Sequence, residues 1–116
     1  MQQMSEPLTL PKSLAAFGTE AFAETLAHEL LDNLWKLPLD KLCKKGGWPY
    51  KDGPFSLYEI DVDDRGGALH IACGVSFEEA VPSCCAGAGA TDNRMGNLSL
   101  AIDKSTALAE AAVTEV

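Results

Sequence analysis

The sequence predicts an α+β fold in which a long N-terminal helix packs on an antiparallel meander of three to four strands. Apolar residues in the N-terminal third recur at intervals of three and four, which is the period of an amphipathic helix. From Leu57 onward the pattern changes to an alternation that is typical of strands. The alternating segments follow one another without helical segments between them, and this favours α+β over α/β.

The chain has 116 residues and a hydrophobic fraction of 47%, which suits one globular domain. We expect a flexible tail over residues 1–10 and a single α+β domain over residues 11–116. The sequence has neither a signal peptide nor the ~20 consecutive apolar residues that cross a bilayer. We therefore expect a cytoplasmic protein.

The long helix is expected between Thr19, a suitable N-cap, and Pro38, which ends or kinks a helix. A short second helix over residues 39–44 is predicted to stop at Gly46 and Gly47. The apolar face of the long helix consists of residues spaced three and four apart, namely Phe22, Ala23, Leu26, Ala27, Leu30 and Leu34.

The two alternating segments that flank Gly66 and Gly67 predict a hairpin with a two-residue turn. This turn sets a register that places the apolar side chains of both strands on one face. The expected pairs are Val62 with Ile71, Ile60 with Cys73, and Tyr58 with Val75.

The C-terminal third contains one more clear strand and one ambiguous segment. Leu98, Leu100 and Ile102 alternate with polar or small residues and predict the third strand. Residues 80–96 show no periodicity, so we expect a long loop that includes Pro82–Gly96. After residue 106 the alanine-rich composition favours a helix, whereas the alternation of Ala109, Ala111 and Val113 favours a fourth strand. Both alternatives stay open.

The net charge of −8 argues against nucleic acid and anionic membranes as partners. Residues 36–51 nevertheless hold five of the nine basic residues, with aromatic residues beside them. Basic and aromatic side chains are enriched together at protein interfaces. The predicted partner-binding residues are Lys41, Lys44, Lys45, Trp48 and Tyr50. In the alternative interpretation, the lysines form a solvated face and the aromatic rings fill the core.

The hairpin also contains an acidic turn, in which Asp61, Asp63 and Asp64 lie close together in the sequence. We expect these carboxylates to meet the lysines within one chain or across a dimer.

A second candidate site centres on Cys84 and Cys85, with Cys73 and His70 upstream. Thiolates and imidazole suit zinc or an iron–sulfur cluster. No Cys-x-x-Cys pair is present, however, and strand alternation points Cys73 and His70 to opposite faces. Free thiols in a reducing compartment are the simpler interpretation.

A third pattern, His28 followed by Asp32 one helical turn later, departs from the two-histidine zinc motif of hydrolases. Its alternative is a solvated helix face. The carboxylate pairs Asp63–Asp64 and Glu78–Glu79 are interpreted as ordinary turn and edge charges.

Taken together, these patterns predict a small acidic cytoplasmic module, more consistent with a non-enzymatic role than with an enzyme. The expected partner is another protein or a second copy of the chain, and no cofactor is expected. The alternative function is thiol or metal binding through the segment that contains Cys84 and Cys85.

Overall fold

The structure is a computed structural model that describes residues 7–81 and 90–115. Strands make up 50% of it and helices 24%. The helices are α1 (Pro11–Ala16) and α2 (Phe22–Asp32), followed by the 3₁₀ turns η1 (Leu34–Lys36) and η2 (Leu39–Leu42). The strands are β1 (Leu8–Thr9), β2 (Trp48–Pro49), β3 (Ser56–Arg65), β4 (Ala68–Val81), β5 (Ala90–Asp103) and β6 (Leu108–Glu115).

The predicted fold class is wrong, because the described chain is mostly a curled antiparallel sheet of six strands with two short helices. The expected helix from Thr19 to Pro38 is replaced by α2, which has eleven residues, and by η1. The second expected helix, over residues 39–44, is the four-residue turn η2.

Side-chain hydrogen bonds on either side of α2 explain why this helix is short. The Thr19 hydroxyl donates to the Ala16 carbonyl and accepts from the Ala21 N–H, so Thr19 closes the preceding turn and does not cap α2. At the other end, the Asn33 side-chain amide donates to the Glu29 carbonyl at 2.8 Å. This bond satisfies one of the carbonyls that a helix end leaves without a partner.

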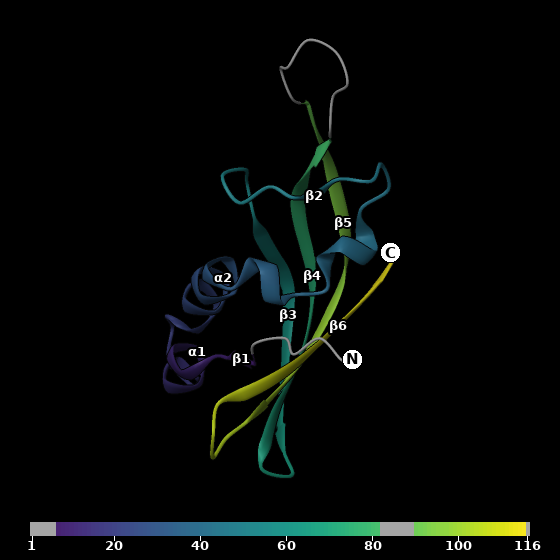
Figure 1. Cartoon of the computed structure of the whole chain (residues 1–116). Coiled ribbons are helices and arrows are strands. Elements are labelled where there is room, and N and C mark those ends of the chain that lie inside the picture. The colour runs from purple at the N-terminus through teal and green to yellow at the C-terminus, as the bar shows by residue number, and fades with distance from the viewer. Residues whose placement is uncertain (1–6, 82–89, 116) are drawn as a thin grey trace, which may run out of the picture.

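All strands of the sheet pair in antiparallel fashion, in the order β1-β6-β5-β4-β2, and β3 also pairs with β4. Figure 1 shows the sheet curling, with α1 and α2 gathered on one side of it. The long strands β4 and β5 pair continuously from Ala68 opposite Asp103 to Val81 opposite Ala90. Residues 90–96 are therefore strand where a loop was expected. The other part of that expected loop, residues 82–89, lies outside the described residues.

The hairpin of β3 and β4 turns at Gly66 and Gly67, as predicted, and both glycines have the positive φ angles (65° and 80°) of a two-residue turn. Val62 pairs with Ile71, which is the predicted register near the turn. Beyond a bulge at Glu59 (φ 54°) the register is shifted. Tyr58 consequently pairs with Gly74, and the predicted pairing with Val75 is wrong.

The C-terminal segment is the strand β6, so the helical alternative is wrong. The Asp103 carboxylate accepts hydrogen bonds from the N–H and the hydroxyl of Ser105 and closes the turn before this strand. The alternating residues Ala109, Ala111 and Val113 are half-buried and pack on the core.

The core lies between the helices and one face of the sheet, which we call the inner face; the opposite face is the outer face. The inner face contributes Leu69, Ile71, Cys73, Val75, Phe77, Leu98, Leu100 and Ile102. The helical side contributes Phe22, Leu26, Leu30, Leu34, Leu39 and Leu42. Leu8 and Leu10 are also buried, and β1 pairs with β6, so residues 8–10 belong to the fold. Residues 8–10 are therefore not part of a flexible tail, although one was expected over residues 1–10. Residues 1–6 lie outside the described residues.

Candidate partner-binding face

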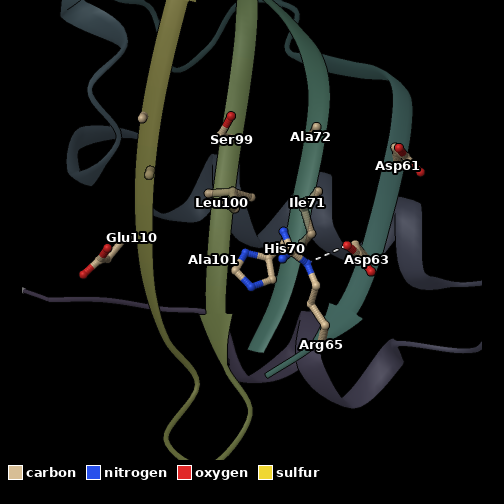
Figure 2. Close-up of a pocket in the computed structure, with 12 residues that line it drawn as sticks. Asp61, Asp63, Arg65, His70, Ile71, Ala72, Ser99, Leu100, Ala101 and Glu110 are labelled. Atoms are coloured by element: carbon tan, nitrogen blue, oxygen red, sulfur yellow. Dashed lines mark ion pairs between the residues drawn. The ribbon is translucent and has the colours of Figure 1, made fainter. Parts of the chain in front are cut away.

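The outer face of the sheet carries small side chains that stand in rows across four strands. One row runs from β3 to β6 through Asp61, Ala72, Ser99 and Ala112. The next row runs through Asp63, His70, Ala101 and Glu110. A groove of about 480 Å³ follows these two rows (Figure 2). Its floor is made of alanine and serine side chains, and its sides carry carboxylates.

The charges of this groove are only partly balanced within the chain. Arg65 Nε lies 2.7 Å from Oδ2 of Asp63, and this pair stands at the β3 side (Figure 2). Asp61 on β3 and Glu110 on β6 are exposed, and neither forms an ion pair with any residue of 7–81 or 90–115. The groove therefore presents one uncompensated carboxylate on each side.

Large apolar side chains are exposed on the same face. Trp48 is 47% exposed and lies opposite Ala80, while Met95 is 54% exposed and lies opposite Ser76. Tyr50 is 39% exposed, and its N–H donates to the Glu78 carbonyl at 2.8 Å. Residues that face each other across a strand pair project to the same side, so these three side chains point outward.

Tyr58 lies between the groove and these apolar residues. Its ring covers Gly74, because a Cβ atom at position 74 would collide with the ring. Tyr58 is half-buried as a result. The small Gly74 thus lets an aromatic ring lie flat on the outer face.

The sheet separates the members of the predicted partner-binding site. Trp48 and Tyr50 lie on the outer face, whereas the Lys44 and Lys45 N–H groups bind Glu79, whose side chain is on the inner face. Lys45 Nζ also pairs with Asp92 at 2.7 Å. The remaining predicted residue, Lys41, is exposed in η2.

The acidic turn of the hairpin does not make the contact that was expected within one chain. Asp64 pairs with Lys104 at 3.0 Å, and Asp63 pairs with Arg65, so within the described chain neither carboxylate meets the lysine segment.

Glu79, predicted from the sequence to be an ordinary edge charge, is fully buried. Its carboxylate accepts hydrogen bonds from the backbone N–H groups of Lys44, Lys45 and Gly47 and from Arg94 Nε, at 2.7 to 3.0 Å. Burial alone would raise the pKa of this carboxyl, but the three N–H donors and the Arg94 charge outweigh it and lower the pKa. The strand alternation through Val75 and Phe77 extends to position 79 and is the signal that could have found it.

Glu79 thereby holds the loop that leads into β2. Gly47 approaches β4 so closely that a Cβ atom there would collide with the Ala80 carbonyl oxygen. The clamped loop positions β2 at the edge of β4, and this places Trp48 on the outer face.

The structure does not bring the described members of the predicted thiol site together. Cys73 is buried on the inner face, and His70 is half-buried on the outer face. Burial raises the pKa of the Cys73 thiol to about 11. Cys84 and Cys85 lie outside the described residues.

Within the described residues, the zinc pattern on α2 has no third ligand. His28 and Asp32 line a cavity of about 290 Å³ between α1 and α2, together with Lys12, Glu24, Thr25 and Glu29. Over residues 7–81 and 90–115, no three His, Cys, Asp or Glu side chains are grouped as metal ligands.

No protein-family model, curated protein or solved structure matches this chain. None of the helices in the described parts of the chain has the length and apolar composition required to span a bilayer.

Proposed function

We propose that this protein is a protein-binding module whose partner docks on the outer face of the sheet. The observation that carries the proposal is the distribution of exposed apolar side chains. Four of the six large hydrophobic residues that are exposed in the described chain lie on the outer face, namely Trp48, Tyr50, Met95 and Leu108. Leu108 belongs to this face because its neighbour in β6, Ala109, packs on the core and successive side chains of a strand alternate between faces. Single exposed hydrophobic residues are normal, but several exposed on one face are typical of an interaction surface.

The identities of these residues support the same function. Tryptophan and tyrosine are enriched among the residues that contribute most to binding energy. Methionine adapts its shape to different partners because its chain is unbranched and flexible. The acidic charge of the chain disfavours nucleic acid and anionic membranes as partners.

We propose a non-enzymatic role for the protein and place it in the cytoplasm. The described cysteines Cys43 and Cys73 are free thiols, which suits a reducing compartment. The bound chain is either another protein or a second copy of this one.

Site-specific photo-cross-linking in cells of the source organism tests this function. A photoreactive amino acid replaces Met95 on the outer face and, in the control variant, Trp35 on the helical side. Trp35 is 62% exposed and is therefore at least as accessible as Met95. We expect a discrete cross-linked product from position 95 and none from position 35. Its mass distinguishes a second copy from another protein. Cross-links from position 35 alone, or from neither position, would contradict the proposal.

A further inference from the structure

Building on the proposed function, we infer that the outer groove accepts a basic, partly apolar segment of a different protein. The groove lies between Asp61 and Asp63 on β3 and Glu110 on β6. Its occupant would place lysine or arginine side chains beside these carboxylates and apolar side chains on the floor.

The floor explains why a polypeptide fits. Ala72, Ser99, Ala101 and Ala112 have short side chains, so the backbone of a bound segment can approach the sheet closely. The aliphatic stems of lysine and arginine pack on such apolar surface while their charged ends reach solvent or a carboxylate. Small side chains alone would not select one kind of partner. The carboxylates of the groove provide this specificity.

The charges determine what kind of segment binds. Arg65 already neutralises Asp63, but Asp61 and Glu110 have no ion-pair partner among residues 7–81 and 90–115. A cationic segment would compensate one carboxylate on each side of the floor. The net charge of −8 would also accelerate the approach of a basic partner by long-range attraction.

The same charges disfavour a second copy as the occupant. Two outer faces packed against each other would bring the uncompensated Asp61 and Glu110 carboxylates of both chains into one interface. Each chain offers only Arg65 and His70 as groove residues that carry or can acquire positive charge, and Arg65 is already paired. Like charges placed opposite each other act against such association.

Fluorescence anisotropy with a labelled octapeptide of alternating lysine and valine tests the inference on the full chain. The octapeptide of alternating glutamate and valine serves as the control ligand. The double variant Asp61→Asn/Glu110→Gln removes the two uncompensated carboxylates. Glu20→Gln/Glu24→Gln is the matched control, because it changes the net charge equally at two exposed positions at and near the start of α2. Thermal melting verifies that every variant is folded.

We expect the lysine peptide to bind more weakly as salt increases and the glutamate peptide not to bind. The groove variant should lose roughly two- to thirtyfold in affinity, and the helix variant should lose markedly less. Ser99→Arg, which places a cation on the floor, should reduce binding as well. Equal losses in the groove and helix variants would overturn the inference, because they would indicate attraction by net charge alone.

The two proposals fail in different ways. Cross-linking at position 95 without binding of the lysine peptide would overturn the basic segment and leave the protein-binding function intact. Failure of both experiments would overturn both.

Discussion

Arg94 lies diagonally across the β4–β5 pair from Glu79, and its Nε donates to Oε1 of that fully buried carboxylate at 2.8 Å. This pair belongs to the inner face, yet it has a consequence for the outer face. The carboxylate of Glu79 also binds the backbone N–H groups that precede β2. Because β2 begins at Trp48, the buried carboxylate of Glu79 on one side of the sheet determines the position of an exposed aromatic residue on the other.

The first prediction concerns the strength of this cluster. Glu79→Gln leaves Arg94 with only its longer ion pair to Asp92 (3.7 Å) and offers an amide N–H₂ group to backbone donors, so we expect a loss of about 3 kcal/mol in the free energy of unfolding. Glu78→Gln, one residue away on the outer face, should change it by less than about 0.5 kcal/mol. Urea denaturation of both variants provides the comparison. Equal stabilities would show that Glu79 does not hold the loop.

The second prediction concerns how the stability that Glu79 contributes depends on pH. The pKa of Glu79 is lowered on folding, so the unfolded chain binds the proton more tightly than the folded chain does. Its stabilising effect is fully present above the ordinary glutamate value of 4.5 and is lost as the pH falls below it. The stability difference between the wild type and Glu79→Gln should therefore shrink steadily in acid. A difference that is constant with pH would contradict this assignment.

The third prediction concerns α1, whose N-cap residue, Leu10, forms no side-chain capping hydrogen bond. The buried Glu29 carboxylate of α2 accepts hydrogen bonds from the Lys12 N–H at 3.1 Å and from the Ser13 N–H at 2.8 Å, and thus takes over this role. Glu29→Ala should cost about 2 kcal/mol and speed the exchange of these two amide hydrogens. Glu24→Ala, on the exposed side of the same helix, should cost no more than about 1 kcal/mol. Unchanged amide exchange in Glu29→Ala would refute the cap.

The fourth prediction concerns the described thiols. Burial raises the pKa of both Cys43 and Cys73 to about 11, and for Cys43 the nearby Glu79 charge adds to the effect. The protonated thiol is a poor nucleophile, so Cys73 should resist alkylation at about pH 8 in the folded protein and react after denaturation. Mass spectrometry of the alkylated peptides measures this at each residue. Rapid alkylation of native Cys73 would contradict its buried position.

Local sequence patterns predicted the parts of the fold in which one interaction dominates. The Gly66–Gly67 turn was predictable because glycine adopts positive φ angles without a steric penalty, and a two-residue hairpin turn requires them. The bulge at Glu59 was not, because nothing in the alternation reports a non-glycine residue with φ 54°. Alternation places Cys73 and His70 on opposite faces, and the structure has them there.

Other elements depend on contacts between distant residues. The strand over residues 90–96 was missed because Asp92 and Arg94 occupy the inward positions of its alternation. The shortest ion pairs of these charges are with residues of other segments, Lys45 for Asp92 and Glu79 for Arg94. The burial of Glu79 was missed for the same reason, because the groups that bind its carboxylate belong to other segments of the chain. The rows of small residues on the outer face become a groove only when β3, β4, β5 and β6 are aligned in register.

Hydroxyl-radical footprinting, performed in cells of the source organism and on the purified protein, tests most directly whether the outer face is a binding face. Trp48 and Met95 report on the outer face, and Trp35 is an internal control in the same molecule. We predict that oxidation of Trp48 and Met95 is severalfold lower in cells than in the purified protein, with Trp35 unchanged. Equal oxidation of Trp48 and Met95 in both settings would contradict a partner on the outer face.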